Sequence, residues 1–456
     1  MQEFNIGIVG AGHVGLVTGA CLAHIGHRVT LVDVDVERVR ALERNEVPIY
    51  EPELKELMVQ SADRVFFTTE LSLIVPEADV IFIAVDTPTG EDGSADLSSV
   101  EAVARTIGQA LSGVDRENPL VVVNKSTVPV GSGDYVSMLI QEGLRETGVE
   151  QANFRVVSSP EFLREGSAVY DSLFPDRIVL GTSSQEALDT IRALYKPIIE
   201  QSFPTNLDPR PKVTVPLITT DLASSEMIKY AANAFLATKI SFINEIGNIC
   251  ELVGADVNSV AFGIGLDKRI GTRFLNAGIG WGGSCFPKDV SALRAIAAEY
   301  DYEAKMLSAT ADINERQRRQ VITKLQRDLH TLKGKRVALL GLVFKPDTDD
   351  LRETPSLEIA RRLIAQGARV VGYDPVGGKA AAHAMPELQV AYDPYEALDG
   401  VHAAVLVTEW EEFRRLDLER VASSMQEPRL LIDGRNVFNP RDAKSAGMLY
   451  RGFGRA

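Results

Sequence analysis

Cysteine is scarce in this chain, which has only Cys21, Cys250 and Cys285 among its 456 residues. So few thiols, in an odd number, argue against a disulfide framework and favour a reducing compartment, so we expect a cytoplasmic protein. Long apolar runs are missing as well, since none reaches the roughly 18 residues of a membrane-spanning helix. The first residues also lack the basic and apolar regions of a signal peptide, and we expect no membrane partner.

Positive charge is in short supply too. The sequence has 48 Lys and Arg residues against 63 Asp and Glu residues, a net charge of −15. A surface of that sign repels nucleic acid and anionic lipid, so we expect no nucleic-acid partner. Any phosphate-bearing ligand must then be bound by local features. The remaining composition is that of an ordinary globular protein, and at roughly 100–200 residues per domain the length predicts two or three domains.

The start of the chain follows the pattern strand, glycine turn, helix, strand. An apolar run at 4–9 leads directly into a glycine-rich turn, and a second apolar run follows at 29–32. Further short apolar runs, typical of buried strands, lie at 80–85, 120–123, 154–157 and 178–180. Strands that alternate with helical stretches predict an α/β fold with a mainly parallel, doubly wound sheet.

The middle of the chain changes character. The stretch 201–216 is rich in Pro and polar residues, which is typical of a linker, whereas 222–253 has no Pro and only one Gly. That length suffices for a helix of about 30 residues, and helix-like segments resume at 290–299 and 304–329.

From residue 333 the opening pattern of strand, turn, helix and strand recurs without the glycine triplet and ends at Asp374. We therefore predict two Rossmann-like, doubly wound parallel-sheet domains joined by a central helical block with a long helix. The predicted bounds are 1–205 for the first domain, 206–325 for the block and 326–456 for the last domain. The final residues, 448–456, are expected to form a loose tail.

The glycine-rich turn is GAGHVG (10–15), a G-x-G-x-x-G motif between a predicted strand and a predicted helix. Such a turn lets the backbone approach a pyrophosphate, whose charge the helix N-terminus stabilises. Asp33 follows 23 residues after Gly10, where a carboxylate binds the adenosine ribose and repels the 2′-phosphate of NADP. We expect NAD to contact Gly10, Gly12, Val14, Gly15 and Asp33. A structural turn with a solvated Asp33 is the alternative, and Arg38 either flanks the adenine or is a solvated helix residue.

Cys285 lies in the segment GWGGSCFPKD (280–289), whose glycines and proline predict a loop able to approach a ligand. Lys288 and Asp289 follow within four positions, and a nearby cation or base raises the thiolate fraction of a thiol. Cys21 and Cys250 lie in apolar helical stretches, so we interpret them as small buried hydrophobes. A buried structural thiol is also the alternative for Cys285.

A nucleotide cofactor combined with a nucleophilic thiol suggests oxidation of an alcohol to an acid in two hydride transfers. The first transfer gives an aldehyde, the thiolate adds to it, and the second transfer gives a thioester that water hydrolyses. Such an enzyme needs a nucleophile, a cation for the developing oxyanion and a base that positions water.

Several motifs carry a resemblance over essentially the whole chain. They are GIVGAGHVGLVTGACLA (7–23), VDTPTGEDGSADLSSVE (85–101), NKSTVPVGS (124–132), SSPEFLREGSA (158–168), SSEMIKYAANAFLATKISFINEI (224–246), GIGLDKRIGTRFLNAGIGWGGSCFPKD (263–289) and GLVFKPDTDDLRETPS (341–356). On these motifs the chain resembles the UDP-glucose/GDP-mannose dehydrogenase family. The resemblance implies a four-electron oxidation at C6 of a nucleotide sugar with two NAD and no metal. The GGSCFPKD form of the thiol loop favours UDP-glucose.

The resemblance also implies catalytic roles. Cys285 would be the nucleophile, and Asp289 would orient or activate the thiol and water. Lys229 and Asn233, four residues apart on one helix face, would stabilise the oxyanion. Taken without the motif, Lys229 would be interpreted as a solvated helix residue.

Two further residues complete this set. Thr127 would hold the catalytic water, and Glu161 would act as a general base. Without the motif, each of them, like Lys229, would be interpreted as an ordinary surface residue.

The resemblance also implies ligand contacts, some of them at the catalytic residues just named. Those for the sugar nucleotide are Glu161, Phe162, Leu163, Arg164, Lys229, Asn233, Arg269, Phe274, Leu275, Asn276, Gly282, Phe344, Lys345 and Arg435. Those for NAD are Thr87, Pro88, Thr127, Glu165, Lys288 and Arg352. In such enzymes the residue matching Arg269 comes from a second subunit, so a homodimer is implied. Arg164 would be an additional phosphate contact.

Three alternatives remain open at this point. The substrate could be GDP-mannose or another nucleotide sugar. The chain could instead be a two-electron hydroxyacid dehydrogenase, although that class needs neither the thiol nor a second α/β domain. It could also be a non-catalytic NAD-binding regulator, against which the intact set of catalytic residues argues. In bacteria, the products of such enzymes commonly serve polysaccharide synthesis, by family analogy.

Overall fold

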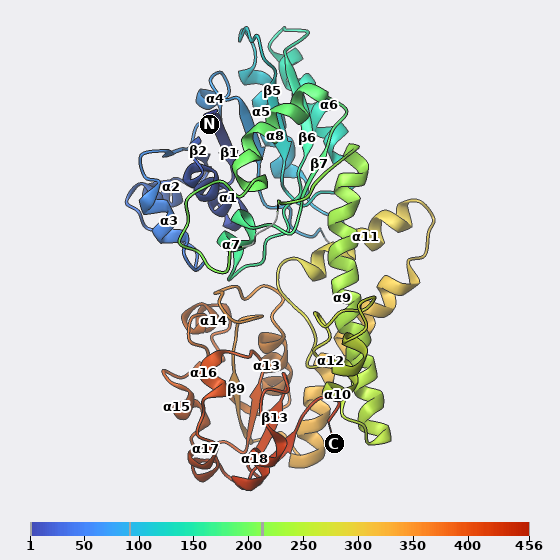
Figure 1. The fold of residues 1–456 in the computed structure, drawn as a ribbon. Helices are drawn as coiled ribbons and strands as arrows, with labels where there is room; N and C mark the ends of the chain where they lie inside the picture. The colour runs from blue at the N-terminus through green and yellow to red at the C-terminus, as the bar shows by residue number, and fades with distance from the viewer. Residues whose placement is uncertain (1, 91–92, 211–213, 456) are drawn as a thin grey trace. The chain divides into compact units, whose positions relative to one another are not determined.

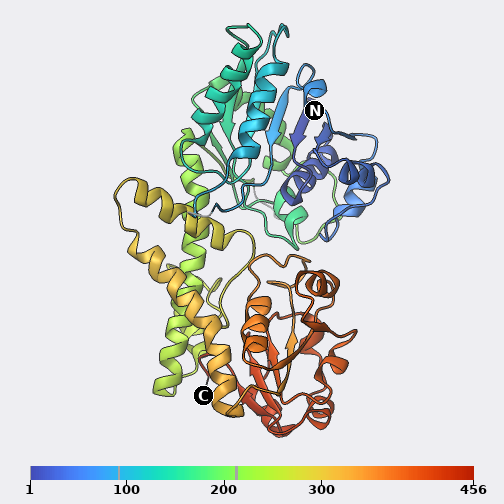
Figure 2. The same ribbon diagram turned by 180° about the vertical axis from the view of Figure 1, so that it is seen from behind.

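The computed structural model describes residues 2–90, 93–210 and 214–455. It divides into two compact units, Met1–Ala231 and Ala232–Ala456, which Figures 1 and 2 show from two sides. Each unit contains one sheet of mainly parallel strands with helices packed on it.

The sheet of the first unit has the order β3-β2-β1-β4-β5-β6-β7-β8. Its strands are β1 (Asn5–Val9), β2 (Arg28–Val32), β3 (Val65–Thr68), β4 (Val80–Ile83), β5 (Leu120–Asn124), β6 (Phe154–Ser158), β7 (Ile178–Gly181) and β8 (Leu217–Thr220). Neighbours pair in parallel except β6 and β7. The strand order reverses between β1 and β4, which is the point where open α/β sheets bind dinucleotides.

Helices cover both faces of this sheet. They are α1 (His13–His24), α2 (Val36–Glu43), α3 (Leu54–Gln60), α4 (Leu71–Ile74), α5 (Ser98–Ala110), α6 (Ser132–Glu146), α7 (Ala168–Leu173) and α8 (Gln185–Ile199). Along β5, Val121 and Val123 belong to the core with α1, α7 and α8, whereas Leu120 and Val122 belong to the core with α5 and α6. Strands buried on both faces are apolar throughout, which is why short apolar runs revealed them in the sequence.

The helix α9 (Leu222–Val253) starts in the first unit and continues into the second. Its bounds confirm the long helix expected at 222–253, since its interior lacks the prolines that would break it. The helices α10 (Val257–Gly265), α11 (Phe286–Glu299) and α12 (Lys305–Leu329) follow, as the central helical pattern predicted. The domain bounds at 205 and 325 stay a prediction.

The sheet of the second unit has the order β11-β10-β9-β12-β13-β14 and is parallel throughout the described residues. Its strands are β9 (Arg336–Leu340), β10 (Arg369–Tyr373), β11 (Gln389–Val390), β12 (Ala403–Leu406), β13 (Leu430–Asp433) and β14 (Leu449–Arg451). Its helices are α13 (Pro355–Ala365), α14 (Gly378–Ala384), α15 (Pro394–Leu398), α16 (Glu411–Arg414), α17 (Leu418–Ser424) and α18 (Pro440–Ser445). Both sheets open with the same strand order, which confirms two Rossmann-like domains.

The two Rossmann-like sheets differ at the aspartate that ends the second strand. Asp374 follows β10 and accepts backbone N–H groups of Leu342, Val343, Val376 and Gly377, and the indole N–H of Trp410. Protein donors therefore satisfy both oxygens of this carboxylate.

The prediction of a loose tail at 448–456 is wrong. β14 extends the sheet, and the Phe453 side chain is fully buried. The N–H of Gly454 donates to Oε1 of Glu251 over 2.8 Å, and its carbonyl accepts the N–H of Val257. These partners lie about two hundred residues earlier in the sequence, so no local sequence pattern predicts the contacts.

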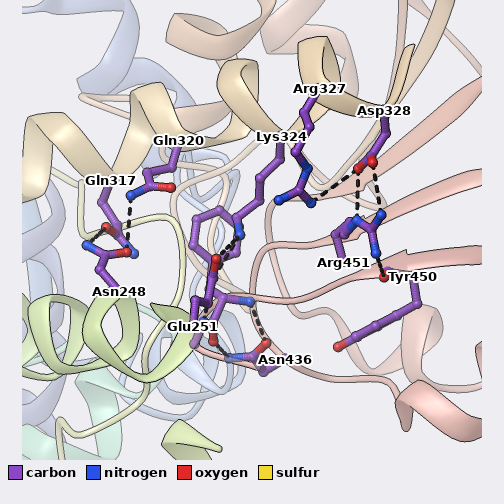
Figure 3. A network of polar contacts seen from close by, with 12 residues as sticks. Asn248, Glu251, Gln317, Gln320, Lys324, Arg327, Asp328, Asn436, Tyr450 and Arg451 are labelled. Carbon is purple, nitrogen blue, oxygen red and sulfur yellow. Dashed lines mark hydrogen bonds and ion pairs between the residues drawn. The ribbon is translucent and has the colours of Figure 1, made fainter. Parts of the chain in front are cut away.

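Polar contacts around this segment tie it to the long helices, as Figure 3 shows. Lys324 of α12 reaches Glu251 of α9 with its Nζ 2.7 Å from both carboxylate oxygens. Arg451 of β14 forms a two-point ion pair with Asp328, with both N–O distances at 2.9 Å. The C-terminal segment therefore joins the last sheet to the helices within the second unit.

Replacing Phe453 with alanine should lower the free energy of unfolding of the second unit by about 3–5 kcal/mol, because the cavity left by a buried ring is not refilled. Both tryptophans, Trp281 and Trp410, lie in this unit, so urea unfolding followed by tryptophan fluorescence reports on it selectively. Tyr392→Ala, at a 93% exposed position, is the matched control. An unchanged urea midpoint for Phe453→Ala would show that the buried Phe453 side chain does not stabilise the second unit.

Candidate active site

The glycine turn has the shape that a dinucleotide needs. Gly10 has φ +101°, and a Cβ atom there would lie 2.5 Å from the carbonyl oxygen of Ala84. A Cβ on Gly15 would collide with the carbonyl oxygen of Gly10, so the turn packs tightly onto α1. By contrast, the space beside Gly12 is open to at least 4 Å. The turn thus leaves room at the N-terminus of α1, where a pyrophosphate binds in such folds.

Asp33 stands at the end of β2, next to that turn. Its Oδ2 accepts the N–H of Ala11 over 2.8 Å and Nη1 of Arg38 over 2.9 Å, and its Oδ1 accepts the N–H of Asp35. The side chain of Arg38 is therefore aimed at Asp33. Both residues lie where the adenosine ribose of NAD would be bound, so the donor set fits NAD.

The carboxyl ends of β4 and β5 bring Thr87 and Thr127 together. Thr87 donates its hydroxyl to the carbonyl oxygen of Thr127 over 2.8 Å, and Thr87 is buried. Pro88 follows on the exposed side. The order of the strands thus unites two segments that are about forty residues apart in the sequence.

A buried ion pair joins the segment after β6 to α9. Nζ of Lys229 donates to Oε1 and to the main-chain carbonyl of Glu161, both over 2.7 Å. The other carboxylate oxygen of Glu161 accepts the N–H of Leu163. Burial by itself raises the pKa of Glu161, but the charge and hydrogen bond of Lys229, aided by Lys125, bring it below its ordinary value. Glu161 is therefore held as a carboxylate.

Lys125, which sequence reasoning missed, belongs to the same cluster of charges. It directly follows β5, in the NKSTVPVGS motif, two residues before Thr127. Burial lowers its pKa to about 8; Glu161 opposes this effect and the neighbouring charge of Lys229 adds to it. Its position in that motif was the signal that could have identified it.

The loop 161–168 is fixed by several side chains. Two cations lie near the Phe162 ring: its centroid is 3.7 Å from the Arg177 guanidinium carbon and 5.5 Å from Nζ of Lys229. Arg164 bonds to both carboxylate oxygens of Asp171, and its side chain is 55% exposed. Leu163 packs against the apolar core, and Glu165 is partly buried.

In the second unit, Cys285 is the N-cap residue of α11 and is exposed. Ser284 Oγ lies 3.6 Å from its sulfur. A helix N-terminus stabilises negative charge, so this position favours a thiolate. Asp289 lies one turn further along α11 and is buried. Its Oδ2 accepts Nδ2 of Asn233 over 2.5 Å, and its Oδ1 lies 3.9 Å from Nζ of Lys288.

The thiol loop is built against the last domain by contacts inside the second unit. Gly283 has φ +86°, and a Cβ there would lie 2.7 Å from the Phe344 ring, so a glycine is required. Arg435 donates to the carbonyl oxygens of Gly280 and Val407 over 3.0 and 2.7 Å. Trp281 is held by Asn314, whose Oδ1 accepts its backbone N–H. Arg435 and Phe344 thus support the loop that carries Cys285.

The remaining predicted ligand residues of the second unit differ in exposure. Leu275 is buried in an apolar cluster with Ile243 and Ala277, so its side chain serves the core. Asn276 is exposed, and Phe274 and Gly282 are partly buried. Nζ of Lys345 lies 5.4 Å from the centroid of the Phe344 ring. Arg269 and Arg352 are exposed and pair with Asp267 and Asp350, respectively.

Three models of one protein family match the chain between residues 4 and 440. Residues 4–199, 223–316 and 338–440 match the NAD binding domain, the central domain and the UDP binding domain that define the UDP-glucose/GDP-mannose dehydrogenase family. The chain belongs to the UDP-glucose/GDP-mannose dehydrogenase family. Membership makes it an NAD-dependent oxidoreductase and confirms the cofactor expected from the glycine turn and Asp33.

Relatives within the family cover nearly the full length. The UDP-glucose 6-dehydrogenase TuaD of Bacillus subtilis is 44% identical over 99% of this chain and 93% of its own length. A UDP-glucose 6-dehydrogenase of Pseudomonas aeruginosa is 45% identical over 98% of this chain and 97% of its own. The solved UDP-glucose dehydrogenase of the archaeon Pyrobaculum islandicum superposes with a TM-score of 0.89 at 36% identity, covering 100% of this chain and 98% of that one.

Within 2–90, 93–210 and 214–455, no helix is long and apolar enough to cross a membrane. Over the same residues, no group of three or more His, Cys, Asp or Glu side chains is placed to hold a metal ion.

Replacing Lys125 with methionine should remove a distinct pH dependence of stability. Its pKa is about 8 in the folded chain and near the ordinary lysine value in the unfolded chain, so above pH 8 the unfolded state binds the extra proton. Between pH 7.5 and 9.5, the free energy of unfolding of the wild type should therefore rise by about 1–2 kcal/mol more than that of Lys125→Met. Urea unfolding followed by circular dichroism measures this difference, with the exposed Lys55→Met as control. Equal pH dependence of wild type and Lys125→Met would show that the ammonium titrates as a solvated lysine.

Proposed function

We propose that this chain oxidises UDP-glucose at C6 to UDP-glucuronate in four electrons, with two NAD consumed per sugar. The observation that carries the proposal is the exposed thiol of Cys285 at the N-terminus of α11, one turn before the buried carboxylate of Asp289. A two-electron hydroxyacid dehydrogenase needs no such thiol. The relatives at 44–45% identity are named for UDP-glucose, which supports this substrate over GDP-mannose or an N-acetylated sugar.

Each of the two NAD molecules, when bound, would accept one hydride, and the side chains of the protein perform the remaining steps. In the first oxidation the C6 hydroxyl loses its proton and C6 loses a hydride, which leaves an aldehyde. The Cys285 thiolate adds to the aldehyde carbon and forms a thiohemiacetal, whose oxyanion Lys229 and Asn233 stabilise. Asp289 orients the thiol and Asn233, to which it is hydrogen-bonded.

The second oxidation removes a hydride and a proton from the thiohemiacetal and leaves a thioester on Cys285. Water held by Thr127 then attacks the thioester carbonyl, Glu161 takes the proton, and the C–S bond breaks to release the acid and the thiolate. Glu161 can act as a base because Lys229 and Lys125 keep it ionised.

We propose the ligand contacts on the same grounds. The loop with Phe162, Leu163, Arg164 and Glu165 lies around the sugar and phosphates, and Phe274, Leu275, Asn276 and Gly282 lie along the uridine. Leu275 takes part through its backbone, since its side chain is buried. The contacts from the last domain are Phe344, Lys345 and Arg435, and those for NAD include Thr87, Pro88, Lys288 and Arg352. We propose that the NAD-binding domain ends at residue 205 and that the UDP-sugar-binding domain begins after residue 325.

We also propose that the chain works as a homodimer formed through α9. Phe235, Phe242 and Ile249 of this helix are 66%, 48% and 48% exposed. They stand seven residues apart, so they form one apolar stripe along the helix. Phe262 of α10 is likewise exposed. A second copy covering this stripe would bring its Arg269, which is exposed on the single chain, to the substrate.

The thiol chemistry requires reduced Cys285, so we propose a cytoplasmic location. The product, a glucuronate donor, is the kind of nucleotide sugar used in polysaccharide synthesis, which we propose as its destination.

Replacing Cys285 with alanine should abolish acid formation while UDP-glucose and NADH still bind, because the thioester cannot form. Acid production is read by chromatography over a panel of UDP-glucose, GDP-mannose and UDP-N-acetyl sugars, and wild type should favour UDP-glucose. Cys250→Ala is the matched thiol control and should keep acid formation. Near-normal UDP-glucuronate production by Cys285→Ala would contradict the covalent mechanism, and a preference for GDP-mannose would contradict the substrate.

Replacing Phe242 with arginine should turn the dimer into monomers, because a charge in the middle of the apolar stripe cannot be buried without a partner. Size-exclusion chromatography with light scattering gives the mass directly. Tyr392→Arg, far from α9 in the sequence and 93% exposed, should leave the dimer intact. A dimer that survives Phe242→Arg would place the interface elsewhere.

A further inference from the structure

Glu51 has no role in the steps above, yet its carboxylate is fully buried. It lies shortly before α3, and three donors surround it. Its Oε2 lies 2.7 Å from Nε2 of His13 and accepts the N–H of Gly166 over 2.8 Å. Its Oε1 accepts the N–H of Ala168 over 2.7 Å. Because a carboxylate only accepts hydrogen bonds, the imidazole Nε2 of His13 is the donor.

The three donors come from two segments with different tasks. His13 is the first residue of α1 and follows Gly12, where the glycine turn leaves room for the pyrophosphate of NAD. Gly166 and Ala168 end the loop 161–168, to which we assign the sugar nucleotide. The donors stand 38, 115 and 117 residues from Glu51, so the fold alone brings them to one carboxylate.

The loop 161–168 is held by side-chain contacts at its start, in its middle and at its end. Glu161 at its start is bonded to Lys229, and Arg164 in its middle is bonded to Asp171. At its end, a single oxygen of Glu51 is shared between Gly166 and His13. A shift of His13 therefore changes a contact that positions the loop.

We propose that Glu51 is a positioning residue that couples the cofactor turn to the sugar-nucleotide loop, so that each ligand strengthens the binding of the other. This coupling rests on the proposed function, because it takes the loop as the substrate contact. A ligand that orders the turn fixes His13 and, through Glu51, the loop, so the second ligand meets a site already ordered. The coupling must be equal in both directions, since it is a free energy between two binding sites.

The coupling is measured with NADH and UDP-glucose, a pair that cannot react because NADH accepts no hydride. The fluorescence of NADH gives its dissociation constant with and without saturating UDP-glucose. The wild-type chain should bind NADH at least about 5-fold more tightly when UDP-glucose is present. His13→Leu removes the link to the turn but keeps both backbone bonds to Glu51, and the ratio should fall below about 2-fold.

Matched variants separate coupling from a general loss of structure. His13→Gln still offers an N–H to Glu51 and should restore the ratio. His24→Leu removes the imidazole at the other end of α1, where His24 meets the carbonyl of Pro204, and should leave the ratio unchanged. If His13→Leu fails to fold, Glu51→Gln in the same assay decides, because it removes the charge and one acceptor at similar size.

The outcomes distinguish this coupling from the proposed function. A wild-type ratio near one, or a full ratio in His13→Leu or Glu51→Gln, overturns the coupling alone as long as UDP-glucose binds. Failure of UDP-glucose to bind the wild-type chain overturns the proposed function and the coupling with it.

Discussion

In a sheet of parallel strands, every carboxyl end opens on the same edge, and the first unit places its functional groups along that edge. Asp33 follows β2, Thr87 follows β4, Lys125 follows β5 and Glu161 follows β6. The strands before them are mostly buried, and most of their side chains are apolar. The functional polar groups therefore stand where the strands end, and the strand order reverses between β1 and β4, the point where open α/β sheets bind dinucleotides.

Charges placed at such an edge are partly buried, and each must be compensated by protein groups. Glu161 is compensated by Lys229 and a backbone N–H, Asp33 by Arg38 and backbone N–H groups, and Glu51 by His13 and two backbone N–H groups. Isolated burial of these carboxylates would be prohibitive, whereas paired burial fixes their geometry. The compensation explains why a chain of net charge −15 can present a well-ordered site to anionic ligands.

The elements and residues that a local pattern or a motif encodes could be predicted from the sequence. Apolar runs gave the strands on either side of the glycine turn, and the missing prolines gave α9 from end to end. The motifs identified Glu161, Lys229, Asn233 and Asp289, which the structure brings together in two hydrogen-bonded pairs. The buried tail around Phe453 escaped because its partners are about two hundred residues away. Glu51 was missed because a single Glu, without its spatial partners, is indistinguishable from a solvated one. Lys125 was missed although it lies within the NKSTVPVGS motif.

The proposed reaction requires the thiol of Cys285 to bind the sugar covalently between the two oxidations. The most direct test counts NADH against UDP-glucose consumed, with NAD in excess and the product identified. The account predicts two NADH and one UDP-glucuronate per UDP-glucose, with no free aldehyde accumulating. One NADH per sugar, with the aldehyde as final product, would contradict it.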